Sequence, residues 1–202
     1  QTHVDRTTKI TLERIVPVQE AFRQMGALVV HGPSPDCARK YPEWLEEEVD
    51  ERQRPEGDWP PADFRGKAGE YAGFARPHTE RTEEFDRIIR DRRIVPEAAP
   101  RGDDRVVANG EALHRLLRRR GVLFLFYMGF AANMCVPFRD YGMRAMKDRG
   151  YEVVLLEDCT TAIEVEDTAD DLLLSQACKI DAALTIGYTL QSADLLTACS
   201  EV

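Results

Sequence analysis

Cys135 is the side chain of this sequence best placed to do chemistry. Residues 121–137 (GVLFLFYMGFAANMCVP) indicate a buried strand, a glycine turn and then a helix that begins at the cysteine. Pro137 fits the first turn of such a helix, where its missing N–H needs no partner. A helix N-terminus offers unpaired N–H groups and positive potential, which favour a thiolate and can hold an oxyanion. The pattern predicts a reactive thiol, with a small buried core residue as the alternative.

Helices and strands alternate along the chain around Cys135. Apolar spacing predicts helices over residues 8–25, 110–120, 135–147, 172–178 and 192–198. It predicts strands over residues 27–31, 122–128, 152–157 and 182–185. Such alternation is typical of βαβ units, so we expect a single α/β domain over residues 1–202, with three α/β/α layers and a mainly parallel, doubly wound sheet. Ligands gather at the carboxyl ends of such strands, which is where Cys135 falls.

A long irregular region, about residues 36–103, interrupts this alternation and is rich in proline, glycine and charged residues. Such segments are lids, binding loops or subunit contacts, or else solvated insertions without a role. The region carries four aromatic rings, Trp59, Phe64, Tyr71 and Phe74. We expect most of these rings to be buried, either as the roof of a pocket or against a neighbouring subunit, because a monomer rarely leaves that much apolar area in water.

Two further polar side chains lie at the ends of predicted strands. His31 precedes a Gly-Pro loop at a strand end, a position where ligands often bind, so we count it among the pocket candidates. Asp158 also ends a strand and is interpreted as capping a turn with Thr160 and Thr161.

Composition narrows the class of protein. The 202 residues carry a formal net charge of -9, which argues against general binding to nucleic acid or to an anionic membrane surface. We find neither a bilayer-length apolar run nor an opening signal peptide, and so expect a cytoplasmic protein. The five cysteines are scattered without a CxxC pair and the four histidines lack paired spacing, which indicates no disulfide framework and no metal site.

Two segments resemble the isochorismatase-like cysteine hydrolases: GFAANMCV at 129–136 and RDYGMRAMKDRGYEVVLLEDCTTA at 139–162. The resemblance spans about residues 105–190. It implies that Cys135 is the nucleophile and that Phe130–Ala131 is the cis peptide of the family. It also implies that the backbone N–H groups of Ala131 and Cys135 form the oxyanion hole, in a reaction that needs no cofactor or metal.

The family normally completes its site with an Asp at the end of its first strand and a Lys ahead of the helix that corresponds to 110–120. Residues 106–110 (VVANG) contain no lysine, and naming Asn109 or Arg76 for its role is a guess. The sequence shows no strand ahead of helix 8–25. Because that helix and the strand after it form the second half of a βαβ unit, we expect a strand preceding Gln1 to supply the carboxylate.

The resemblance implies a cysteine-dependent hydrolase that acts on a small amide or related acyl compound through a thioester intermediate. We expect a small-molecule substrate and a homo-oligomer. The alternative is a catalytically silent homologue that binds a small metabolite or a protein partner, because a thiol without its base loses activity. Hydrolysis of the isochorismate vinyl ether is a weaker possibility, since that branch of the family does not rely on a cysteine nucleophile.

Overall fold

A computed structural model describes residues 2–46, 59–75 and 83–201. The chain divides into two compact units, Gln1–Glu47 with Ile94–Val202 and Glu48–Arg93, which we describe separately. The region predicted to be irregular, residues 36–103, is wider than the second unit, Glu48–Arg93. The residues at its two ends belong to the larger unit. Within that unit, the Leu45 amide donates to the Val106 carbonyl at 2.8 Å.

The larger unit begins with one continuous helical rod. This rod consists of α1 (His3–Ile10), a π-helical turn η1 (Thr11–Ile15) and α2 (Val16–Gln24). The rod begins earlier than the predicted residue 8 because Thr2 and Asp5 form a capping box, each side chain bonded to the other's backbone amide. The wide turn lies just ahead of Pro17, which has no N–H to donate. Gly26 ends the rod at a φ of 73°, as glycine permits.

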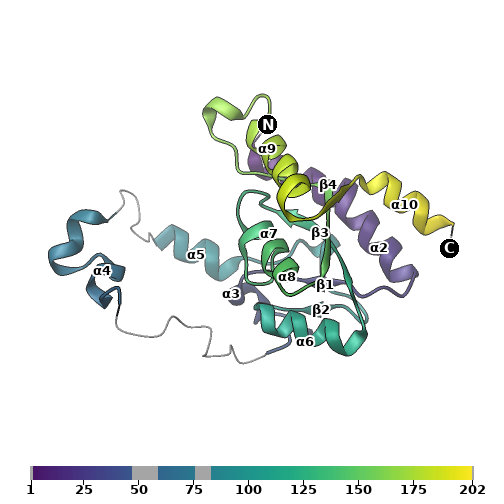
Figure 1. Ribbon diagram of the computed structural model, residues 1–202, viewed down its shortest axis with the longest axis horizontal. Coiled ribbons are helices and arrows are strands. Elements are labelled where there is room, and N and C mark those ends of the chain that lie inside the picture. The colour runs from purple at the N-terminus through teal and green to yellow at the C-terminus, as the bar shows by residue number, and fades with distance from the viewer. Residues whose placement is uncertain (1, 47–58, 76–82, 202) are drawn as a thin grey trace. The chain divides into compact units, whose positions relative to one another are not determined.

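All strand pairs in the described residues are parallel (Figure 1). β1 (Val30–His31) pairs with β2 (Arg105–Val106) in a two-stranded sheet. A three-stranded sheet has the order β3 (Phe124–Phe130), β4 (Glu152–Thr161), β5 (Tyr188–Leu190). The parallel sheet with helices on its faces confirms the predicted α/β class.

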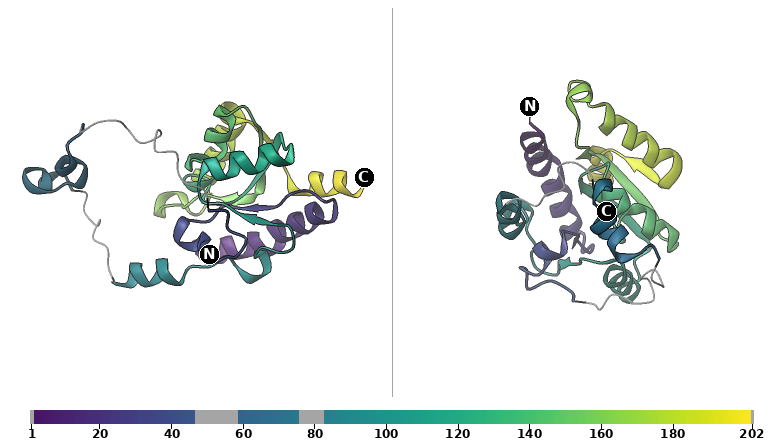
Figure 2. Two further views of the ribbon diagram at one scale, coloured as in Figure 1. Left: turned by 90° about the horizontal axis from the view of Figure 1, so that it is seen from below. Right: turned by 90° about the vertical axis from the view of Figure 1, so that its left-hand side faces the viewer.

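Helices cover both faces of these strands (Figure 2). One core cluster joins the strands to α6 (Gly110–Arg120), α8 (Met143–Asp148) and a π-helical turn η6 (Ala182–Ile186). The other joins them to η1, α2 and α10 (Ser192–Ser200). Val30 of β1 and Tyr127 of β3 pack against the first cluster, so the two sheets share one hydrophobic core.

The helix predicted over 135–147 is two helices, α7 (Cys135–Phe138) and α8. Arg139 has an extended backbone, with a ψ of 156°, and ends α7. The chain then turns closely at Gly142, where a Cβ atom would lie 2.7 Å from the Val136 carbonyl oxygen. Asp140 fixes the break by accepting a 2.7 Å hydrogen bond from the Gly110 amide at the start of α6.

The strand predicted over 182–185 is also wrong. These residues form η6, which continues directly from α9 (Leu173–Asp181), and the strand follows at β5. Gly187 separates the two elements at a place where a Cβ atom would lie 2.2 Å from the Val153 carbonyl oxygen. Apolar residues alone could not distinguish a buried helical turn from a short buried strand here.

The smaller unit contains α4 (Ala62–Gly66), a 3₁₀ segment η3 (Gly69–Phe74) and α5 (Glu83–Asp91). The Phe64 ring contacts Tyr71 edge-on at 5.3 Å and Phe74 at 6.5 Å between centroids. We expected most of the four rings to be buried, but Trp59 is 79% exposed and Phe74 is 66% exposed in the single chain. Their role in a pocket or a subunit contact stays a prediction.

None of the helices in the part of the chain that the structure describes has both the length and the apolar character needed to cross a membrane.

Candidate active site

The candidate site lies at the carboxyl end of β3. Gly129, at a φ of 118°, precedes a cis peptide bond between Phe130 and Ala131, and a turn then leads to Cys135, the first residue of α7. The Ala131 carbonyl accepts hydrogen bonds from the amides of Met134 and Val136, at 3.0 and 3.2 Å. These bonds close the turn and bring Cys135 back beside the end of the strand.

Three backbone amides of this turn remain free to donate. Within the described residues, the N–H groups of Ala131, Asn133 and Cys135 have no hydrogen-bond acceptor. Unpaired amides in a folded protein meet either water or a ligand. The amides of Ala131 and Cys135 are the two to which the resemblance gives the role of binding an oxygen atom of the substrate.

The turn is tied to the neighbouring strand end by Asn133. Its side chain donates to the Ile163 carbonyl and accepts from the Ile163 amide, both at 3.0 Å. The Ala132 amide adds a 3.0 Å bond to the Thr161 carbonyl at the end of β4. The loop after β4 is held in turn by Ser175 of α9, whose hydroxyl accepts from the Ala162 amide at 2.9 Å. Sequence reasoning missed Asn133 because its partner lies 30 positions away.

Arg139 and Tyr141 lie on the segment that follows Cys135. Burial lowers the pKa of Arg139, but a hydrogen bond with Cys135 and the negative charge of neighbouring groups raise it more, so the net shift is upward. Burial raises the pKa of Tyr141 to about 12, so it is a neutral phenol at ordinary pH. The Tyr141 hydroxyl donates to the Pro33 carbonyl at 2.7 Å, which places the end of β1 beside the site as well.

The free cysteines differ in burial. Cys37 and Cys159 are buried, whereas Cys135, Cys178 and Cys199 are partly exposed. Burial, followed by the charge of Asp158, raises the pKa of the Cys159 thiol to about 12. Burial also raises the pKa of Cys178, on α9, so both of these thiols remain protonated near neutral pH.

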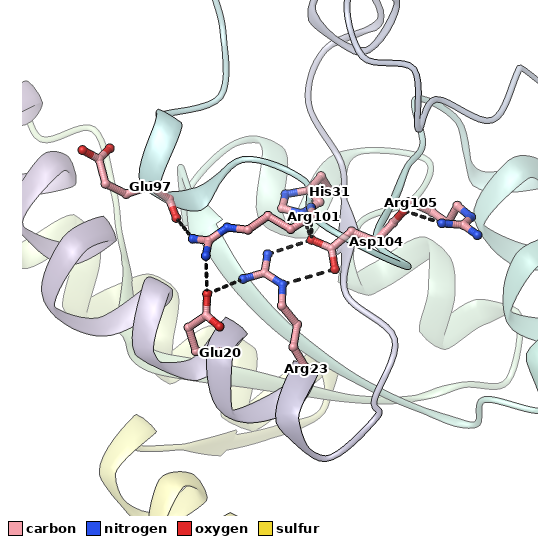
Figure 3. A network of polar contacts seen from close by, with 7 residues as sticks. All are labelled: Glu20, Arg23, His31, Glu97, Arg101, Asp104 and Arg105. Carbon is pink, nitrogen blue, oxygen red and sulfur yellow. Dashed lines mark hydrogen bonds and ion pairs between the residues drawn. The ribbon is translucent and has the colours of Figure 1, made fainter.

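His31 belongs to a buried polar network (Figure 3). Its Nε2 atom lies 3.0 Å from Asp104, which also binds Arg23 through two contacts of 2.7 and 3.3 Å. The Arg101 amide donates to the same carboxylate at 3.0 Å, and Glu20 of α2 bridges both arginine side chains. His31 is 7% exposed and its Nε2 is engaged by Asp104, so it ties β1 to α2 and the loop before β2.

This network should make the stability of the fold depend on pH in the acid range. Burial lowers the pKa of His31, against the effect of Asp104. Burial would raise the pKa of Asp104, but hydrogen bonds from Arg23, His31 and the Arg101 amide bring it below its ordinary value. Since both folded-state values lie below the unfolded ones, the unfolded chain takes up protons first as the pH falls.

We therefore expect the free energy of unfolding to fall as the pH drops below about 6.5, the unfolded value for histidine, and to fall further below about 4 as Asp104 is protonated. Urea denaturation at several pH values between 7.5 and about 3 measures this. His31→Gln should flatten the part of the curve between pH 6.5 and 5. A wild-type stability that stays constant down to pH 5 would contradict the expectation.

Several predicted site residues have structural roles. Asn109 is the N-cap of α6, where its side chain accepts from the Ala112 amide at 2.7 Å. Asp158 does not cap a turn with Thr160 and Thr161 but accepts from the amide and hydroxyl of Ser192, at the start of α10. Arg76 lies outside the described residues. The described part of the chain contains no metal-binding cluster of three or more His, Cys, Asp or Glu side chains.

Comparison with known proteins places the chain in a family. The family described as "Isochorismatase domain" matches residues 3–178, so the chain belongs to the isochorismatase family. Comparison with curated proteins finds no match.

Solved structures share the fold at low sequence identity. A cysteine hydrolase from Pseudomonas syringae pv. phaseolicola aligns with a TM-score of 0.59 and 14% identity, over 96% of this chain and 82% of that one. A putative hydrolase of the isochorismatase family from Chromobacterium violaceum gives 0.53 and 16%, over 97% and 83%. An isochorismatase from Pseudomonas putida gives 0.52 and 17%, over 93% and 78%. The fold is therefore that of the isochorismatase-family hydrolases.

Proposed function

We propose that this protein is a cysteine-dependent hydrolase of a small amide or related acyl compound. The observation that carries the proposal is the turn at residues 131–135 after β3, which contains the partly exposed Cys135 and the backbone amides of Ala131 and Cys135, both without an acceptor in the described residues. A thiol supplies the nucleophile, and the amides supply donors for the negative charge that develops on a carbonyl oxygen. Membership of the isochorismatase family supports the same chemistry.

In this reaction the Cys135 thiolate attacks the carbonyl carbon of the substrate, and the carbonyl oxygen becomes an oxyanion held by the Ala131 and Cys135 amides. Collapse of this intermediate breaks the C–N bond, and the leaving amine takes a proton as the thioester forms. Water then attacks the thioester, which releases the carboxylic acid and restores the thiol. A general base transfers these protons, and the carboxylate expected in that role stays a prediction.

Trapping the thioester tests the proposal. The protein is incubated with a panel of small primary amides and N-carbamoyl compounds, quenched in acid and mapped by peptide mass spectrometry, while ammonia release is followed in parallel. We expect an acyl group on the peptide that contains Cys135 and none on Cys178 or Cys199. Ammonia release with an adduct elsewhere, or with no adduct and an unchanged rate after Cys135 is blocked, would overturn the nucleophile.

The silent homologue remains a second candidate because of one observation. Among the described residues, no hydrogen bond joins an Asp or Glu side chain to the thiol of Cys135, which is a free cysteine. Without a base, the thioester could neither form nor be resolved at a useful rate. The same panel separates the two functions: a compound that raises the melting temperature of the protein but is never hydrolysed favours a binding protein.

A further inference from the structure

We propose that two copies of this chain associate through the outer side of α9 and η6. The contact surface is a stripe of four apolar residues along this continuous helical segment, Leu173, Ala177, Ile180 and Leu184, which we name the α9 stripe. The sequence led us to expect a homo-oligomer, and this inference names the surface and the arrangement. It does not depend on the hydrolase proposed above.

The segment formed by α9 and η6 is apolar on two opposite sides. On its inner side, Ala182 and Ile186 are buried in the first core cluster. On its outer side, Leu173 is 48% exposed, Ile180 59% and Leu184 78%. A helix that is apolar all round is ordinarily buried on every side. In the part of the chain that the structure describes, the outer side is left open to water, so a second molecule is needed to cover it.

Helix α6 of the same unit has the ordinary pattern of a surface helix. Its inner side buries Leu113 and Leu117, and its exposed residues include Arg118. The α9 stripe contains no charged residue, and Asp181 beside it lies 2.6 Å from Arg144. Each copy carries a formal net charge of -9, so two copies repel each other least where an uncharged face meets an uncharged face.

The spacing of the stripe favours a second copy as its occupant. Its members are four, three and four positions apart, which is the spacing of helical residues that share one side. The spacing reads the same in both directions. In an antiparallel pair, Leu173 therefore lies opposite Leu184 of the second copy, and the small Ala177 lies opposite the large Ile180. Such self-complementarity is what a two-fold dimer contact requires.

The exposed area also agrees with a dimer contact. Two more exposed apolar side chains adjoin the stripe. Val165 follows Glu164, whose carboxylate accepts from backbone amides at the start of α9. The Phe138 ring lies 5.6 Å from the guanidinium of Arg144, which is the group bonded to α9. Together these side chains expose on the order of 500 Å² of apolar surface in each copy. Two copies would bury on the order of 1,000 Å², which reaches the lower limit for a specific interface.

The first test is the mass of the full chain in solution, measured by size-exclusion chromatography with light scattering over a range of protein concentrations. We expect a dimer, with twice the chain mass of 22.9 kDa. The variants Ile180→Glu and Leu184→Glu place a carboxylate in the contact. Val4→Glu is the matched control, because Val4 lies on α1, outside the stripe, and is 69% exposed.

A carboxylate in an apolar contact loses its hydration, so each stripe variant should raise the dissociation constant of the dimer about 100-fold or more. Ile180 and Leu184 are exposed in the single chain, so both variants should keep the circular dichroism spectrum of the wild type. Val4→Glu should remain a dimer. A monomeric wild type overturns the proposal, because the stripe would then serve another protein or another part of this chain. A dimer that Leu184→Glu leaves unchanged also overturns it.

The second test is the direction of the pairing. Leu173→Cys and Leu184→Cys are prepared separately, mixed, oxidised with copper phenanthroline in air and mapped by peptide mass spectrometry. In the antiparallel pair, residue 173 of one copy lies opposite residue 184 of the other, whereas identical positions lie about 16 Å apart along the helix, too far for a disulfide. We expect a 173–184 disulfide in the mixture and none in either variant alone. Cross-links between identical positions would overturn the antiparallel contact.

Discussion

Cys135→Ala is expected to abolish amide hydrolysis, with a loss of turnover on the order of 10⁴-fold or more, while the fold stays intact. Alanine fits the first position of α7 without strain, because it is a good helix former and because Cys135 is only partly buried. The loss therefore reports the nucleophile and not the packing. Ammonia release by the purified variant, with its melting curve beside it, measures both effects.

Two further variants make this result specific. Cys135→Ser should be nearly as inactive as Cys135→Ala, because a hydroxyl is far less ionised than a thiol at neutral pH. Cys178→Ala is the matched control, since Cys178 is also a partly buried helical cysteine but lies on α9. Turnover retained by Cys135→Ala, or lost equally in Cys178→Ala, would show that the assignment of the nucleophile is wrong.

The apolar runs of the sequence were enough to predict the class of fold and the position of Cys135. The strands β3 and β4 come from continuous runs of apolar residues that end where turn residues begin, so their existence and order could be predicted. The positions of the short strands could not be predicted in this way. β5 has only three residues and follows a helical turn of the same apolar character. Its position depends on the close contact between Gly187 and Val153.

In the candidate site, too, the local features could be predicted from the sequence and the features that depend on distant contacts could not. Cys135 and the free amides belong to one local turn, and a local motif can indicate such a turn. The contacts that hold this turn join residues far apart in the sequence. Asn133 is bonded to Ile163, and the break after α7 depends on the bond between Asp140 and Gly110. A helical pattern over 135–147 conceals this break, because Val136 before it and Met146 after it are both buried. The bond of His31 to Asp104 could not be predicted for a similar reason, since the two residues lie 73 positions apart.

Asp104→Ala should be the most destabilising of the substitutions considered, with a loss of about 3–5 kcal/mol in the free energy of unfolding. Asp104 is 3% exposed and accepts hydrogen bonds from Arg23, His31 and the Arg101 amide. Its removal takes two hydrogen bonds from the Arg23 guanidinium, which keeps only Glu20, and leaves His31 and the Arg101 amide without this acceptor. Breaking a largely buried charge pair by removing one partner costs more than the net gain from the pair. Urea denaturation at pH 7.5 measures the loss.

Asp103→Ala is the control, because Asp103 also forms short ion pairs but lies at the surface, whereas Asp104 is buried. Asp103 lies 2.6 Å from both Arg105 and Arg120, yet its side chain is 62% exposed. Water and salt screen exposed pairs, so this substitution should cost only about 0–1 kcal/mol. Equal losses in the two variants would mean that ion-pair distance and not burial governs stability here. A loss below about 1 kcal/mol in Asp104→Ala would mean that the network around His31 does not hold β1 to α2.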